Sequence, residues 1–316
     1  MIRSLAEVPP AICGGVATIG NFDGVHRGHH ALLERVRKIA TQQNLPALAI
    51  TFEPHPKSVL NPQRHPFYLL TTLEEKISLL QEAGITALLV IPFDESFAAM
   101  TATGFVEEVL VRQLALRHLV IGHDYAFGRN KSGNEELLRR FANQQAFELQ
   151  VLGAHKIAAG IVVSSSTIRQ AVMDGDLPQA TTMLGRFYSV SGEVIRGEGR
   201  GRQIGFPTAN ISSNKLLLPP RGVYATFVTV NGARFKGALN IGLNPTFGGT
   251  STSVEVFILD FNDDIYGSKV QVEFIKRIRN EKAFSSVADL VKQIALDVSA
   301  VKNMVMPYSH GENLAE

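Results

Sequence analysis

The chain has 316 residues, which is long for a single hydrophobic core, and a norm of about 100–200 residues per domain predicts two domains. Hydrophobic residues make up 45% of the sequence and charged residues 19%, a composition typical of globular proteins. Thirty-one Lys and Arg residues face 29 Asp and Glu residues, so the net charge is only +2. This balance argues against a fold-wide basic surface for nucleic acid, although a local basic cleft for phosphates is still possible.

The sequence also bears on the compartment in which the protein works. A single cysteine, Cys13, excludes an internal disulfide framework and fits a reducing compartment. The first ten residues lack the basic start and long apolar run of a signal peptide. No apolar run approaches the roughly 20 residues that span a bilayer. We therefore expect a cytoplasmic protein without membrane or nucleic-acid partners, and the oligomeric state stays open.

The first half of the chain alternates short apolar runs with amphipathic stretches. Strands are expected at residues 15–19, 46–52, 87–93 and 117–122, helices at 30–41 and 73–83, and an amphipathic stretch at 104–115. Strands that alternate with helices predict βαβ units and a parallel, doubly wound α/β sheet. Such sheets bind ligands at the carboxyl ends of their strands, where the loops 21–29, 53–56 and 122–128 lie.

The pattern changes after about Gly185. Strands joined by Gly, Asn and Pro turns are expected at residues 187–195, 222–230, 235–241, 253–260 and 269–277, and no helix is expected before 285. Short strands with close turns predict an antiparallel β-barrel or sandwich, and an amphipathic C-terminal helix at 287–304 is expected to pack against it. The sequence thus predicts two domains, residues 1–185 and 186–316.

Residues 20–29 (GNFDGVHRGH) lie between the first expected strand and the first expected helix. This arrangement points backbone N–H groups at an anion, and Gly28 lets a polyphosphate approach the backbone closely. The spacing of His26 and His29 allows both rings to face the same side, where they can stabilise a departing pyrophosphate. Asp23 can serve as a simple helix N-cap. A chance HxGH tetrapeptide is the alternative, and its position at a strand-to-helix turn weakens that explanation.

A second candidate site combines a glycine-rich loop with a strand carboxylate. Residues 197–210 (GEGRGRQIGFPTAN) contain four glycines and two arginines, which lets the backbone wrap around an anionic ligand. If this segment is extended, the Thr208 and Asn210 oxygens share one face and suit Mg²⁺. Glu255, inside an alternating apolar strand, is placed as a general base for a primary alcohol. A ligand-free glycine hairpin and a solvent-facing barrel carboxylate are the alternatives.

Four blocks of the first half, GNFDGVHRGHH, TFEPHP (51–56), GHDYAFG (122–128) and VSSSTIR (163–169), resemble the N-terminal domain of prokaryotic bifunctional riboflavin kinase/FMN adenylyltransferases. That domain has a Rossmann-like nucleotidylyltransferase fold of the HxGH superfamily. The resemblance makes His26 and His29 catalytic residues. It assigns nucleotide binding to Gly20, Phe22, Asp23, Gly28, Asp124, Ser164, Ser165 and Arg169, and flavin binding to Phe52, Pro54 and His55. A core position for Phe52 and a solvated Arg169 after a helix N-cap run are the alternatives.

The chain departs from the family's pattern at two positions. His30 stands where many relatives have Gln, and Ser166 stands where Thr is commoner. These departures concern fine substrate contacts and leave the expected reaction class unchanged.

Blocks of the second half, GFPTAN (205–210), LPPRGVY (218–224), NPTFG (244–248) and SVEVFILDF (253–261), resemble the riboflavin kinase β-barrel of the same family. The resemblance makes Thr208 and Asn210 ligands of Mg²⁺ and makes Glu255 the catalytic base. It assigns nucleotide binding to Gly205 and Pro207 and flavin binding to Arg277 and Arg279, although exposed arginines on a last strand are common.

Together these resemblances imply an enzyme that converts riboflavin to FMN and FMN to FAD. Its substrates and products would be riboflavin, FMN, FAD, ATP, ADP and pyrophosphate, with Mg²⁺ as cofactor. An enzyme similar to a class I tRNA synthetase or a pantetheine-phosphate adenylyltransferase would share HxGH but would not need the GFPTAN and SVEVF blocks. A non-enzymatic flavin- or nucleic-acid-binding barrel fused to an inactive transferase would need the His pair or Glu255 lost, and the chain keeps both.

Overall fold

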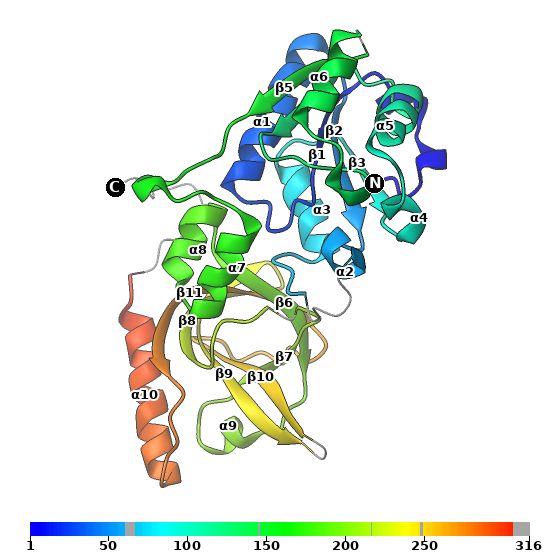
Figure 1. Ribbon diagram of the computed structural model, residues 1–316. Coiled ribbons are helices and arrows are strands. Elements are labelled where there is room, and N and C mark those ends of the chain that lie inside the picture. Colours follow the sequence, from blue (N-terminus) through cyan, green and yellow to red (C-terminus); the bar gives the residue numbers. More distant parts are fainter. Residues whose placement is uncertain (61–66, 145, 216, 247–248, 306–316) are drawn as a thin grey trace. The chain divides into compact units, whose positions relative to one another are not determined.

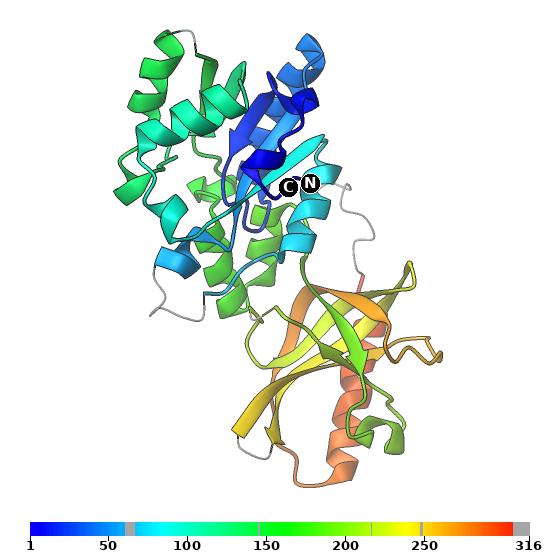
Figure 2. The ribbon, with the colours of Figure 1, turned by 90° about the vertical axis from the view of Figure 1, so that its right-hand side faces the viewer.

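A computed structural model describes residues 1–60, 67–144, 146–215, 217–246 and 249–305 (Figures 1 and 2). Contacts divide the chain into two compact units, Met1–Ser165 and Ser166–Glu316. The domain boundary that the sequence predicts, between residues 185 and 186, lies C-terminal to this division. Contacts group the intervening helices α7 (Ser165–Asp174) and α8 (Leu177–Leu184) with the second unit, where α8 touches its strands.

The first unit is built on a five-stranded parallel sheet in the order β3-β2-β1-β4-β5. Its strands are β1 (Val16–Ile19), β2 (Ala47–Glu53), β3 (Ala87–Pro92), β4 (His118–Gly122) and β5 (Glu148–Leu152). The predicted parallel sheet is confirmed, with β5 added at its edge. The strand order reverses between β1 and β4, and a doubly wound sheet binds its ligands at such a switch point.

Helices cover both faces of this sheet, as a parallel sheet with apolar strands requires. The larger elements are α1 (Arg27–Gln43), α3 (Leu73–Glu82), η4 (Phe105–Gln113) and α6 (Glu135–Asn143); short ones are η1 (Leu5–Glu7), η2 (Pro10–Ile12), α2 (Pro56–Leu60), α4 (Glu95–Ala98), α5 (Ala102–Gly104), η5 (Arg129–Lys131) and η6 (Ala158–Gly160). Residues of α1 and α3 share one core cluster with the sheet, and residues of η4 and α6 share the other. Figure 1 shows α1 and α5 on opposite sides of the strands.

The second unit contains a closed barrel in the order β10-β7-β6-β11-β8-β9, in which all the pairings are antiparallel. Its strands are β6 (Tyr188–Ile195), β7 (Ala209–Ser212), β8 (Gly222–Val230), β9 (Ala233–Thr246), β10 (Gly249–Ile258) and β11 (Lys269–Asn280). The barrel is therefore the correct choice over the sandwich. One short helix, α9 (Arg200–Gln203), corrects the expectation that no helix precedes residue 285.

The helix α10 (Val287–Asn303) lies along the outside of the barrel (Figure 2). Its Val301 is fully buried in a cluster with Ala225 and Phe227 of β8. Ser286 caps its first turn, because the serine hydroxyl accepts a hydrogen bond from the Asp289 N–H. The predicted C-terminal helix is thus confirmed.

Candidate active sites

The two histidines of HxGH form the first turn of α1. His26 is the N-cap, its Nδ1 accepts from the His29 N–H at 3.3 Å, and the His29 Nδ1 accepts from the His26 N–H at 3.3 Å. The rings stack with centroids 3.6 Å apart and 14° between their planes. Because both Nδ1 atoms accept, each neutral ring carries its hydrogen on Nε2. The reciprocal cap therefore leaves the two imidazole Nε2–H groups as hydrogen-bond donors at the N-terminus of α1.

Gly28 lies directly beneath this histidine pair. A Cβ at this position would be 3.2 Å from two atoms of the His26 ring and 3.6 Å from the Cβ of His155. A side chain here would be in tight contact with the His26 ring, which favours glycine at this position. His155 is thus a third histidine beside the turn, and the sequence carried no signal for it because it lies outside the recognised blocks.

The loop before the helix is held by Asp23, which is 1% exposed. Its Oδ1 accepts from the backbone N–H groups of Leu70 and Thr71 at 2.9 and 3.2 Å, and the Thr71 hydroxyl accepts from the Gly24 N–H at 3.0 Å. The N-cap role considered for Asp23 is wrong, because His26 occupies that position. Asp23 instead ties the histidine loop to residues 70 and 71.

The same loop has unusual backbone angles. Phe22 and Val25 are fully buried and have φ values of 47° and 37°, which non-glycine residues rarely adopt. The Phe22 ring meets His29 edge-on at 5.2 Å, and a Cβ at Gly20 would be 3.3 Å from it. Packing against the core therefore fixes an otherwise unfavourable turn and supports the histidine pair from below.

Serine and aspartate positions predicted for nucleotide binding lie around this turn. The Ser165 hydroxyl donates to the carbonyl oxygen of Asp23 at 2.9 Å, which joins the VSSSTIR block to the GNFDG block. Asp124 follows β4 and its side chain is 85% exposed, with Oδ1 turned back over Gly122. Arg169 lies one turn along α7, where its Nη1 donates to the Ser166 hydroxyl at 3.5 Å.

The residues predicted for flavin binding follow β2. Phe52 is 9% exposed and packs against Phe93 and Phe97, with ring centroids 5.8 and 5.7 Å away. This packing supports the core alternative, and flavin contact by Phe52 stays a prediction. Pro54, after a cis peptide bond, is exposed, whereas His55 is buried and its Nδ1 accepts from the Lys57 N–H.

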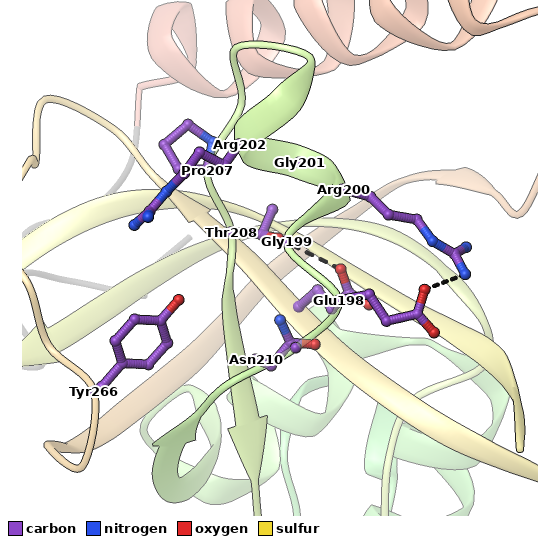
Figure 3. A pocket seen from close by; sticks show the side chains of 11 residues that line it. Glu198, Gly199, Arg200, Gly201, Arg202, Pro207, Thr208, Asn210 and Tyr266 are labelled. Atoms are coloured by element: carbon purple, nitrogen blue, oxygen red, sulfur yellow. Dashed lines mark hydrogen bonds and ion pairs between the residues drawn. The ribbon is translucent and has the colours of Figure 1, made fainter.

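The second unit contains a pocket between the glycine-rich loop and the barrel wall (Figure 3). Thr208 donates its hydroxyl hydrogen to the Glu255 Oε2 at 3.4 Å. Glu255 on β10 lies opposite Asn210 on β7 and opposite Asn240 on β9. The structure thus brings the three predicted kinase residues together. The pocket is lined by residues 197–202 and by Pro207, Thr208, Asn210, Glu255 and Tyr266.

The strand pattern around Glu255 follows the predicted alternation. Val254, Val256 and Ile258 are buried toward the barrel interior, whereas Glu255 is half-buried on the other face. A purely solvent-facing carboxylate would not be expected to line a pocket beside Thr208 and Asn210. The arrangement supports a chemical role for Glu255.

Close backbone packing positions the loop over Asn210. A Cβ at Gly197 would be 2.3 Å from the Asn210 Nδ2, so only glycine fits here without displacing that side chain. Arg200 pairs with Glu198 across the loop, while Gly205, with φ 85°, forms the turn before Pro207. Tyr266 was not singled out from the sequence, because it lies outside the recognised blocks.

Arg277 and Arg279, predicted for flavin binding, have structural partners. The Arg279 guanidinium donates to both carboxylate oxygens of Asp297 on α10, at 2.8 to 3.1 Å, and the Gln293 amide adds a hydrogen bond at 3.0 Å. Arg277 donates to the Arg221 carbonyl and lies 5.9 Å from the centroid of the Tyr224 ring. Flavin binding by this pair stays a prediction, and Arg279 first of all fastens α10 to β11.

We expect Asp297→Ala to lower the free energy of unfolding of the second unit by about 3 kcal/mol, because it leaves a largely buried guanidinium without its carboxylate. Lys292→Ala, an exposed position on the same helix, is the matched control. Urea unfolding followed by circular dichroism measures both. A loss below about 1 kcal/mol, which is the range of surface ion pairs, would contradict the role of Asp297 as a clamp.

Comparison with known proteins agrees with this geometry. A family model described as FAD synthetase matches residues 9–167, and one described as riboflavin kinase matches residues 184–305. The Escherichia coli K12 bifunctional riboflavin kinase/FMN adenylyltransferase is 39% identical over 297 residues, which cover 94% of each chain. The chain belongs to the bifunctional riboflavin kinase/FMN adenylyltransferase family. Both enzymatic domains of that family are present, in the predicted order.

Further members of the family align over similar lengths. The Bacillus subtilis enzyme of the same name is 37% identical and covers 89% of this chain and 90% of its own. A Streptococcus pneumoniae crystal structure described as a macrolide-efflux protein is 33% identical, with a TM-score of 0.88 and coverage of 96% and 98%. Within the part of the present chain that the structure describes, no helix is long and apolar enough to cross a membrane.

Proposed function

We propose that this chain makes FAD in two steps, each in its own domain. The kinase domain, residues 186–316, transfers the γ-phosphoryl group of ATP to the ribityl 5′-hydroxyl of riboflavin, which yields FMN and ADP. The adenylyltransferase domain, residues 1–185, joins FMN to the adenylyl group of a second ATP, which yields FAD and pyrophosphate. The grouping of Glu255, Thr208 and Asn210 beneath the glycine-rich loop is the observation that carries this proposal.

In the kinase step, Glu255 is the general base. Its carboxylate accepts the proton of the riboflavin hydroxyl as the oxygen attacks the γ-phosphorus, and the half-buried strand position holds it at the pocket. Backbone N–H groups of residues 197–202 face the phosphates, and Gly205 and Pro207 shape the turn that follows.

The donor set beside Glu255 fits Mg²⁺. Thr208 and Asn210 offer one hydroxyl and one carboxamide oxygen, and this cation usually takes few protein ligands while it keeps waters and phosphate oxygens. When bound, Mg²⁺ supplies charge neutralisation on the transferred phosphoryl group. Thr208 would then turn its hydroxyl from Glu255 to the cation, which frees the carboxylate for the proton.

In the adenylyl step, the FMN phosphate is already an anionic nucleophile and needs no protein base. It attacks the α-phosphorus of ATP, the bond to the bridging oxygen breaks, and pyrophosphate leaves with the negative charge. The Nε2–H donors of His26 and His29 stabilise this charge together with the helix N-terminus. Ser164, Ser165 and Arg169 supply further donors for the phosphates, and Asp124 borders the nucleotide at the end of β4.

We further propose that Pro54, His55 and Phe52 border the flavin of the adenylyl step and that Arg277 lies toward the flavin of the kinase step. A cytoplasmic location fits the single free cysteine and the use of ATP.

Incubation with riboflavin, ATP and Mg²⁺, followed by chromatographic separation of flavins, tests the proposed function. We expect FMN to appear first and FAD to follow, and removal of Mg²⁺ with a chelator to stop the kinase step. A parallel reaction that starts from FMN isolates the second step, and pyrophosphate release is its independent measure. Failure of both flavins to appear would exclude the function.

A further inference from the structure

Among the residues that the structure describes, two lysines are buried, and they differ in their hydrogen bonds. Lys215 is 6% exposed, its Nζ donates to the Ser189 carbonyl at 2.6 Å, and it lies 4.6 Å from the centroid of the Tyr188 ring. Lys76 is 3% exposed, and no hydrogen bond or ion pair to its ammonium is found within the residues that the structure describes. Because a buried ammonium carries three donors, such a position is costly unless something else supplies acceptors.

Lys76 lies close along the chain to the residues that hold the histidine loop. It is one turn into α3, and residues 70 and 71, just before that helix, are bonded to Asp23 of the histidine loop. Glu53, the last residue of β2, is close enough for its charge to act on the Lys76 ammonium, as is Asp23. The lysine is therefore placed at the carboxyl ends of β1 and β2, the edge at which such sheets bind ligands.

The sheet topology separates two sides at this edge. The switch point between β1 and β4 carries the histidine turn and Asp124, which is the expected ATP side. Lys76 belongs to α3, which follows β2 and the loop that carries His55, and the Glu53 carboxylate at the end of β2 raises its pKa against the effect of burial. A ligand that reaches both sides therefore meets the histidines at one end and Lys76 at the other.

Burial and neighbouring carboxylates act on the pKa of this lysine in opposite directions. Burial lowers the pKa of the Lys76 ammonium, and the carboxylates of Asp23 and Glu53 oppose that shift. Asp23 Oδ1 accepts from the backbone N–H groups of Leu70 and Thr71, which holds this carboxylate beside the start of α3. The Lys76 ammonium, which has no hydrogen bond to the described residues, lies in a domain that must bind an anionic nucleophile.

We propose that Lys76 is a positioning residue that binds the phosphate of FMN, the nucleophile of the adenylyl step, and holds it toward the α-phosphorus of ATP. This inference rests on the proposed function of the first domain. A phosphate oxygen of FMN would accept a charge-assisted N–H···O hydrogen bond from the Lys76 ammonium. The described residues supply no such hydrogen-bond acceptor to Lys76. The lysine touches the acceptor substrate and not ATP, so its loss should act on FMN selectively.

The test is steady-state kinetics of Lys76→Met, with FMN and ATP as substrates and pyrophosphate release as the readout. Starting from FMN bypasses the kinase site. We expect the KM for FMN to rise about 10-fold or more, because one charged hydrogen bond to the acceptor is lost, while the KM for ATP stays within about twofold. Riboflavin phosphorylation by the same variant should be unchanged. Lys38→Met, at an exposed position of α1, is the matched control.

Each other outcome counts against the proposal. An FMN KM within twofold of the parent value shows that Lys76 does not bind the acceptor, and an equal rise in both KM values shows a general disturbance. If Lys76→Met and Lys76→Gln both unfold the first unit, the ammonium is a structural counter-ion, because a lysine whose partner is the ligand should tolerate an apolar replacement. A parent protein that makes no FAD from FMN would instead refute the proposed function itself.

Discussion

Replacing Glu255 by glutamine is expected to lower the rate of riboflavin phosphorylation by about 10²–10⁴-fold, the range that general-base catalysis contributes. Glutamine keeps the size of the side chain and can still accept the Thr208 hydrogen bond. It cannot take the proton of the substrate hydroxyl. The rate of FMN formation from riboflavin and ATP is the measurement, and FAD formation from added FMN should persist.

Two comparisons make the Glu255 result decisive. Glu193→Gln removes an exposed carboxylate from β6 of the same barrel and should leave the kinase rate within about twofold. Glu255→Ala should lower the rate at least as much as Glu255→Gln. If a folded Glu255→Gln protein retains kinase activity within tenfold of the parent, Glu255 is not the base.

The second large effect is expected at His29. Removal of one preorganised donor to a developing negative charge typically costs about 10²–10³-fold in rate, and we expect His29→Ala to lower FAD formation from FMN by this amount. The alanine also removes the reciprocal cap, which contributes about 1 kcal/mol to helix stability. Riboflavin phosphorylation, which uses a different domain, should remain.

Loss of the cap and loss of the imidazole can be separated. His29→Gln restores an acceptor for the His26 N–H, so we expect its thermal unfolding temperature to stay nearer to that of the parent than His29→Ala does. FAD formation should nevertheless fall, because the imidazole Nε2–H and its stack on His26 are lost. Loss of both activities in a folded His29 variant would show that the two sites are not independent.

The sequence predicts some features of the histidine turn, and the tertiary structure adds others. HxGH placed His26 and His29 correctly on one side of a helix start, because local spacing decides ring direction over one turn. The same spacing could not show that His26 itself is the cap or that the rings stack at 3.6 Å. The N-cap role considered for Asp23 rests on the preference of Asp for that position, but the hydrogen bonds of its carboxylate go to residues 70 and 71, far along the chain.

The strands that the sequence does not predict have only weak patterns of apolar residues. β5 is a partly exposed edge strand, and β7 is a four-residue strand that begins at the end of the GFPTAN motif, so neither shows a long apolar run. The barrel closes through pairings such as β6 with β11, which join residues remote in sequence. Alternating patterns are compatible with both a sandwich and a barrel. Two residues of the NPTFG block, Phe247 and Gly248, lie outside the described residues.

By itself the sequence determined the two fold classes, most of the strands and the residues of both motifs, because apolar periodicity, turn residues and short-range spacing are local properties. Tertiary structure alone decided which long-range partners each charged side chain has. It pairs Arg279 with Asp297, joins Thr208 to Glu255, and buries Lys76 of α3. Charge pairing depends on distance in space and on burial, and neither is encoded in the spacing of residues along the chain.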